Sequence, residues 1–263
     1  MKRRLLCGLL SAALLACTIP AKAAKISVPV QVDGERLQTV SYLERGVTYV
    51  PMRAFLDALG DWSIWWDSRT GEAAAASGST TLRADPADDT VTIQGKTYAG
   101  TVWVENGRTY IPLRIVITAL GGQVEWDRYM SGAAVTSPGA DHDASDLYWL
   151  SRIIHAEAQG ESLTGKIAVG NVVLNRVESQ DFPSTIPSVI FDRKNGVQFQ
   201  PVSNGTIFQT PSSQALEAAR RALDGESPVG ACLYFYAPAL SQGAWITTNR
   251  VYYTTIGGHR FYL

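Results

Sequence analysis

Cysteine is scarce in this chain of 263 residues. Only three are present, and because Cys7 and Cys17 fall within the first 23 residues, Cys232 stands alone in the remainder. A single cysteine cannot form an internal disulfide, so hydrophobic cores must hold the folded chain together. It also cannot supply the paired cysteine ligands that a zinc deaminase requires.

Histidine is equally rare, with three in the whole chain and none between residues 24 and 140, a stretch that also lacks cysteine. The ligands that borderline metals prefer are therefore nearly absent from the first half. No His-Glu-x-x-His motif of a zinc peptidase occurs, and no Gly-x-Ser-x-Gly motif of a serine hydrolase occurs. We expect no metal and no cofactor in either half of the chain.

An excess of basic residues is missing too. The sequence has 23 Lys and Arg against 24 Asp and Glu, and removing the four basic residues of positions 1–23 leaves 19 against 24. A net charge of about -5 gives no reason to expect nucleic-acid binding. At 46% hydrophobic and 10% aromatic, the chain can bury real cores and is long enough for two modest domains.

Residues 1–23 have the pattern of a secretory signal. The basic run Lys2-Arg3-Arg4 precedes an apolar stretch over residues 5–16, and Ala21-Lys22-Ala23 provides small residues for cleavage. The apolar stretch is too short to span a membrane. We therefore predict cleavage after Ala23, secretion to the cell wall and no transmembrane segment in the mature protein. The alternative is lipidation of Cys17, which would tether the protein to a membrane.

The first half of the mature chain contains an internal duplication with a period of about 60 residues. The segment 46–55 reappears as 107–116, Ala58-Leu59-Gly60 as Ala119-Leu120-Gly121, and Trp66-Asp67 as Trp126-Asp127. Each copy indicates an extended segment, a short amphipathic helix and a strand that carries the tryptophan. Between the copies, residues 90–98 alternate around a Gly-Lys turn, as a hairpin does.

This doubled pattern resembles the stalk domain named after the N-terminus of copper amine oxidases, over residues 26–137, and implies a duplicated α+β domain. The family name does not imply a metal site in this domain, because residues 26–137 contain no His and no Cys. A binding or anchoring module and a plain spacer both fit, and we favour the spacer or a weak binder. We expect the repeated tryptophans to lie in the core, because they occupy equivalent positions in both copies.

A polar linker, residues 138–145, leads to a helix that begins with Ser145 as N-cap and ends at Gly160. Its apolar stripe is formed by Leu147, Leu150, Ile153 and Ile154, and Glu157 falls in the middle of that stripe. Burial and the negative end of the helix dipole would both raise the pKa of this carboxyl. A raised pKa suits a general acid near neutral pH, whereas a glutamate at a fraying helix end would simply face solvent.

The rest of the chain alternates helices with irregular segments. We predict a second helix over residues 163–177, apolar around most of its circumference and therefore central to the domain. A third helix begins at Thr210-Pro211 and ends at Gly225. Residues 233–236 read as a strand, and a hairpin follows over residues 250–255 with a turn at Gly257-Gly258.

Five blocks of this region, IIHAEAQGE, VGNVVLNRV, QFQP, LYFYAPA and IGGH, occur in order between residues 153 and 259. Together they resemble the spore cortex-lytic (SleB-type) cell wall hydrolase family over residues 146–263. The resemblance implies an α+β, mainly helical, lysozyme-like domain that cleaves peptidoglycan glycan strands. It implies Glu157 as the catalytic residue, and Gln198, Tyr234 and Tyr236 as residues lining the sugar groove or packing in the core.

The same resemblance favours a lytic transglycosylase, which needs one carboxyl group that acts first as acid and then as base. A hydrolase would need a second carboxylate. Glu161 is the other carboxylate close in sequence, and we expect it to be solvated or to cap a helix. The chain departs from the family at His155, Gln159 and Gln200, where Tyr, Arg and Ser are usual. His155 lies about 200° from Glu157 around the helix, so we interpret it as a surface or packing residue.

Two rival functions remain. A cysteine peptidase could use Cys232 as nucleophile and His259 as base, but Cys232 precedes an apolar aromatic strand, where a buried thiol is expected. A non-catalytic protein could bind peptidoglycan through both domains. Spore cortex and vegetative wall, endo and exo cleavage, and a regulatory partner are all left open by the residues.

Overall fold

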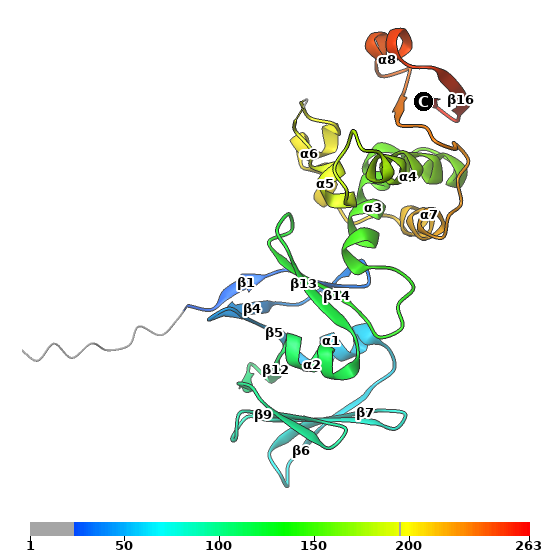
Figure 1. Cartoon of the computed structure of the whole chain (residues 1–263). Coiled ribbons are helices and arrows are strands. Elements are labelled where there is room, and N and C mark those ends of the chain that lie inside the picture. The colour runs from blue at the N-terminus through cyan, green and yellow to red at the C-terminus, as the bar shows by residue number, and fades with distance from the viewer. Residues whose placement is uncertain (1–23, 195) are drawn as a thin grey trace, which may run out of the picture.

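The computed structural model describes residues 24–194 and 196–263, which form two domains that meet at the helix α3 (Ala144–Glu157) (Figure 1). The predicted leader, including Cys17, lies outside the described residues. Within the described part of the chain, no helix is both long enough and apolar enough to cross a membrane.

The two sequence repeats of the N-terminal domain fold into the same succession of elements. The first copy forms β5 (Val47–Pro51), α1 (Met52–Leu59), β6 (Ser63–Asp67) and β7 (Glu72–Ser77). The second forms β12 (Arg108–Pro112), α2 (Leu113–Leu120), β13 (Gln123–Asp127) and β14 (Gly132–Thr136). The remaining strands are β1 (Ile26–Val28), β2 (Val30–Val32), β3 (Glu35–Arg36), β4 (Ser41–Glu44), β8 (Thr80–Asp85), β9 (Thr90–Ile93), β10 (Lys96–Ala99) and β11 (Trp103–Glu105).

The copies meet along β5 and β12, which pair antiparallel with Val50 opposite Ile111. These two residues are equivalent in the repeat, so an approximate two-fold axis passes between them. The sheets run β1-β4-β5-β12-β11, β10-β9-β8-β7-β6 and β13-β14-β2-β3, and one shared core lies between them. The predicted hairpin is confirmed as β9 and β10, with Ile93 opposite Lys96.

The expectation that the repeated tryptophans lie in the core is wrong. Trp66 is 50% exposed and Trp126 is 47% exposed. Both lie on terminal strands of their sheets, and each is opposite a small core residue, Ala73 or Ala133. Alternation along a strand determines which face of the sheet a side chain lies on. It does not ensure burial on a terminal strand, where the large indole extends beyond the core.

The C-terminal domain is mainly helical with a small sheet. Its helices after α3 are α4 (Leu163–Glu178), α5 (Ile186–Ile190), α6 (Gln200–Asn204), the 3-10 helix η1 (Thr206–Phe208), α7 (Ser213–Leu223) and α8 (Ala244–Asn249). Its strands are β15 (Tyr234–Tyr236), β16 (Tyr252–Ile256) and β17 (His259–Tyr262), in the order β15-β17-β16. The central position predicted for the second helix is confirmed, because α4 contacts α3, α5, α7, β15 and β16.

Helix ends differ from the prediction by a few residues. Asp143 rather than Ser145 caps α3, since its carboxylate accepts hydrogen bonds from Ser145 N and Asp146 N at 2.8 and 3.1 Å. The helix ends at Glu157 itself, three residues before Gly160. Helix α7 begins at Ser213, after the N-cap Ser212, and not at Thr210-Pro211. At the two N-terminal boundaries, a side chain that satisfies free backbone N–H groups, Asp143 or Ser212, begins the helix.

The two domains are in close contact around α3. Leu147 packs against Gly34, where a Cβ would meet Leu147 Cγ at 2.9 Å, and φ at Gly34 is +84°, so the position requires glycine. Tyr129 of the turn after β13 stacks on Phe191 with ring centroids 4.3 Å apart. The N-terminal half of α3 is therefore built into the interface, and its C-terminal end carries Glu157.

Candidate active site

Glu157 is the last residue of α3, and the four apolar residues that share its face, Leu147, Leu150, Ile153 and Ile154, are buried. The carboxyl itself is partly buried. Burial raises the pKa of Glu157 to about 7, and the nearby Arg176 guanidinium opposes that rise. The burial effect inferred from the helix pattern is confirmed, and it leaves Glu157 partly protonated at neutral pH.

Arg176 is the charged neighbour that the sequence analysis missed. It projects from α4 into an aromatic enclosure, with its guanidinium carbon 4.9 Å from the ring centre of Phe182, 5.3 Å from that of Phe199 and 5.6 Å from that of Tyr234. Its Nε donates to Leu233 O at 2.8 Å, while Nη1 is buried with no partner among the described residues. Burial lowers the pKa of Arg176 to about 10, so it remains a cation at neutral pH.

Of the three predicted groove residues, Tyr234 lies beside Arg176, whose charge acts on Glu157. Its ring is half-buried, and its hydroxyl accepts a hydrogen bond from Arg250 Nη2 at 2.8 Å. Trp245 of α8 lies 5.8 Å from it, between ring centroids, and is 56% exposed. An exposed indole next to a hydroxyl and two guanidinium groups forms a surface suited to a polar ligand with apolar faces.

Among the described residues, no hydrogen bond or ring contact joins Gln198 or Tyr236 to Glu157 or to Arg176. Gln198 is half-buried and donates to Gly196 O at 3.4 Å, just before the buried Phe199. Tyr236 packs on Tyr262 at 5.9 Å between ring centroids, and its hydroxyl accepts from Arg260 Nη1 at 3.5 Å. Tyr236 therefore contributes to the small sheet.

Glu161 is neither solvated nor a helix cap, contrary to expectation. Its carboxylate accepts hydrogen bonds from Gly258 N at 3.1 and 3.2 Å and lies 3.5 Å from His259 Nδ1. A side chain at Gly257, where φ is +57°, would overlap this carboxylate. Glu161 thus fixes the turn between β16 and β17 against the loop that follows α3.

The remaining candidates have structural positions. His155 is buried, and its Nδ1 accepts from Ser212 N at 3.4 Å, so the packing interpretation is confirmed. Cys232 is fully buried in the core beneath the small sheet, and burial raises the pKa of its thiol to about 11. A thiol with that pKa is protonated at neutral pH, which is the wrong state for a nucleophile.

Both halves of the chain match families of known proteins. Residues 160–262 match the family model described as Cell Wall Hydrolase, and residues 31–134 match the Copper amine oxidase N-terminal domain. A spore cortex-lytic enzyme of Bacillus cereus is 35% identical over 120 residues, which are 46% of this chain and 45% of that protein. The cell wall hydrolase CwlJ of Oceanobacillus iheyensis is 31% identical over 103 residues, covering 37% of this chain and 72% of that protein.

Among solved structures, the catalytic domain of the germination-specific lytic transglycosylase SleB from Bacillus anthracis is similar to this chain at 34% sequence identity. It covers 47% of this chain and 98% of that one, with a TM-score of 0.43. The chain belongs to the cell wall hydrolase family, as the sequence blocks predicted. It spans about half the length of the spore cortex-lytic enzymes that it matches, 45% in the Bacillus cereus relative.

Proposed function

We propose that this protein cleaves the glycan strands of peptidoglycan as a lytic transglycosylase, with Glu157 as its single acid and base. The observation that carries the proposal is the half-buried Glu157 carboxyl, whose pKa of about 7 lets it donate a proton near neutral pH and accept one afterwards. The similarity to spore cortex-lytic enzymes supports the same substrate class.

In the first step, Glu157 donates its proton to the glycosidic oxygen, and the bond from that oxygen to the anomeric carbon breaks. Positive charge develops on the sugar ring as an oxocarbenium ion. In the second step, the 6-hydroxyl of the same muramic acid attacks the anomeric carbon, and its proton passes to the Glu157 carboxylate. The product is a 1,6-anhydro sugar, no water is consumed, and Glu157 is again protonated.

A route without a second carboxylate fits the surroundings of Glu157. Among the described residues, Arg176 is the one charged group that shifts the Glu157 pKa appreciably. Glu161 is held by the Gly257-Gly258 turn, and Asp192 acts on Arg176 rather than on Glu157. Neither carboxylate shifts the Glu157 pKa appreciably, which supports a mechanism with one carboxyl group.

Mass spectrometry of fragments released from purified peptidoglycan tests the proposal, with the protein and its Glu157→Gln variant compared directly. We expect anhydromuramyl ends from the unmodified protein and no release by the variant. Fragments with reducing ends would show that the enzyme is a hydrolase and not a transglycosylase. Cleaved peptides would favour the cysteine peptidase, and binding without release would favour a non-catalytic wall protein.

We also propose that the protein acts outside the cytoplasmic membrane after cleavage behind Ala23. The basic, apolar and small-residue succession in residues 1–23 supports this, as does a substrate located in the wall. N-terminal sequencing of protein recovered from the producing cell tests it. A chain beginning at Ala24 is expected, whereas a lipid-modified Cys17 at the N-terminus would replace release with anchoring.

A further inference from the structure

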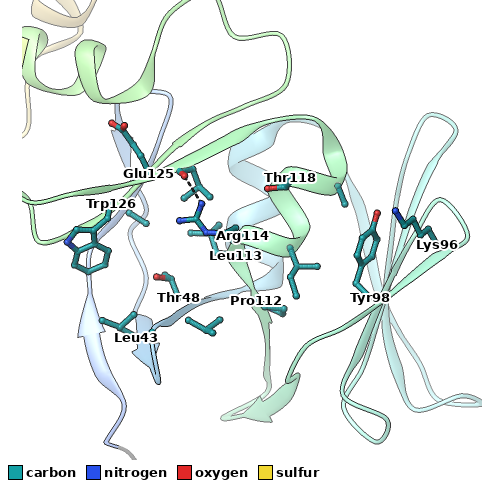
Figure 2. A pocket seen from close by; sticks show the side chains of 16 residues that line it. Leu43, Thr48, Lys96, Tyr98, Pro112, Leu113, Arg114, Thr118, Glu125 and Trp126 are labelled. Carbon is teal, nitrogen blue, oxygen red and sulfur yellow. Dashed lines mark hydrogen bonds between the residues drawn. The ribbon is translucent and has the colours of Figure 1, made fainter. Parts of the chain in front are cut away.

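Two grooves open on the N-terminal domain, and each is lined by one of the repeated tryptophans. The Trp126 groove has a volume of about 970 Å³ and is lined by Trp126, Arg114, Thr48, Lys96, Tyr98 and Glu125, together with apolar residues of α2 (Figure 2). The Trp66 groove has a volume of about 450 Å³ and is lined by Trp66, Arg53, Asp57, Arg108 and Thr109, among others. Neither groove involves the candidate active site.

The grooves are equivalent under the approximate two-fold axis. Trp126 and Arg114 of the second copy correspond to Trp66 and Arg53 of the first. Each groove is completed by the other copy, since Thr48 contributes to the Trp126 groove and its equivalent Thr109 to the Trp66 groove. The fold therefore builds the same kind of site twice, with both copies required for each.

The side chains retained between the copies point to these grooves. Most retained residues are explained by packing, since the Tyr, Pro and Asp pairs are buried. Among the retained polar or aromatic side chains that reach the surface, the threonine, arginine and tryptophan pairs line the grooves, whereas the pair Glu44 and Glu105 does not. The arginines hold the helix to the Trp strand, through Arg53 to Ile64 O at 3.0 Å and Arg114 to Val124 O at 3.1 Å. Packing does not explain why both copies retain a tryptophan whose indole is about half exposed.

The chemistry of the grooves suits a charged saccharide. An indole face carries the negative lobe of its quadrupole, which attracts the weakly positive C–H face of a pyranose ring. Figure 2 shows Trp126 and Tyr98 on opposite sides of the groove, with Arg114 between them. Each groove has two basic side chains and one acidic, Lys96 and Arg114 with Glu125, and Arg53 and Arg108 with Asp57. This local basic excess stands out in a chain whose net charge without residues 1–23 is about -5.

We propose that both grooves bind the N-acetylated glycan strand of peptidoglycan, whose peptide stems carry carboxylates that complement the basic side chains. The tryptophans stack on sugar rings, and the arginines and threonines donate to hydroxyl, acetamido and carboxylate oxygens. This inference rests on the proposed function for its substrate class. It replaces the spacer interpretation of the N-terminal domain with a bivalent holding site, which raises the local concentration of glycan at the catalytic domain.

The test measures binding without turnover, using the full chain with Glu157→Gln. Its affinity for insoluble peptidoglycan is determined by co-sedimentation for the parent, for Trp126→Leu, for Trp126→Phe and for the double variant Trp66→Leu with Trp126→Leu. We expect Trp126→Leu to weaken binding about tenfold, as loss of one aromatic stacking contact does, and the double variant to weaken it further. Trp126→Phe keeps a ring and should lose less than Trp126→Leu. An undiminished affinity of the double variant would overturn the proposal.

Competition identifies the occupant. A soluble tetramer of N-acetylglucosamine is expected to displace the parent and to shift the indole N–H resonances of Trp66 and Trp126 in NMR spectra. Displacement by free stem peptide but not by the saccharide, or unmoved indole resonances, would overturn the glycan assignment even if a Leu variant failed to fold. Because no step involves cleavage, a failure of Glu157 as the acid leaves this result unaffected, and the two proposals fail separately.

Discussion

Asp127 and Trp149 join the two domains through one buried hydrogen bond, in which the indole Nε1 of Trp149 donates to Oδ2 of Asp127 at 2.5 Å. The other carboxylate oxygen of Asp127 accepts from Tyr129 N at 2.8 Å and Met130 N at 3.0 Å. Asp67, the equivalent residue of the first copy, accepts from Arg69 N at 3.1 Å, and its other partner among the described residues, Arg83, belongs to the same domain. Of the two equivalent aspartates, Asp127 has thus become one of the contacts between the domains.

We predict that Asp127→Ala lowers the free energy of unfolding by about 1–3 kcal/mol more than Asp67→Ala does. Both variants lose a turn cap, but only Asp127→Ala leaves the buried Trp149 N–H without an acceptor. Urea unfolding followed by Trp fluorescence measures both, and Asp127→Ala should also broaden the transition as the domains uncouple. Equal losses in the two variants would show that the interdomain bond contributes nothing measurable.

Cleavage is predicted to fall as the pH rises through about 7. In the proposed mechanism the acid form of Glu157 is the reactive one. Burial raises the pKa of that carboxyl from its usual 4.5 to about 7, so the rate should decline as the proton is lost. Because the Arg176 cation lowers the Glu157 pKa, Arg176→Gln should move the decline in rate to higher pH. Arg176→Lys keeps the positive charge and should shift the decline less. A pH–rate profile with an unmoved limb in Arg176→Gln would contradict this electrostatic link.

Glu157→Gln should make the protein more stable at alkaline pH. Because the folded-state pKa of Glu157 is raised to about 7, folding favours the protonated form, and stability is lost as the pH rises from the unfolded pKa near 4.5 through 7. The variant escapes this loss and should exceed the parent by up to about 3 kcal/mol at pH 8, with little difference at pH 4. Asp146, whose pKa is raised to about 6 mainly by burial, titrates in both proteins and cancels. Thermal unfolding at the two pH values measures the difference.

Glu161→Gln is expected to retain glycan cleavage while lowering the unfolding midpoint. A neutral amide oxygen accepts more weakly from Gly258 N than a carboxylate does, so the turn between β16 and β17 loosens. Gly257→Ala should destabilise more, because its methyl group would overlap the Glu161 carboxylate at a positive φ. Abolished cleavage in folded Glu161→Gln would instead identify Glu161 as a second catalytic carboxylate.

Cys232→Ala should leave release of wall fragments intact, and a thiol reagent should label Cys232 only after unfolding. The thiol is fully buried and its pKa is about 11, so the native protein presents no thiolate. Cys232→Ser provides the matched comparison and should be less stable than Cys232→Ala, since it buries a hydroxyl group in an apolar core. Loss of activity in folded Cys232→Ala would favour the alternative function, a cysteine peptidase.

Local pattern was enough to predict the raised pKa of Glu157, because a carboxylate on an apolar helix face is visible within one helix. Arg176 escaped prediction because the rings around it come from Phe182, Phe199 and Tyr234, which only the tertiary fold brings together. The Glu161 contact with Gly258 joins residues 97 apart in sequence. The exposure of Trp126 depends on its strand lying at the end of a sheet, which the alternation of side chains cannot reveal.

Helix α3 also fixes the spacing between the interdomain contact and Glu157. Trp149 fixes it to the N-terminal domain, and Glu157 lies two turns further along, roughly 12 Å away at the rise of an α-helix. A one-turn change between Trp149 and Glu157 would therefore move the Glu157 carboxyl by about 5.4 Å relative to Asp127 and to its neighbour Trp126 in the groove.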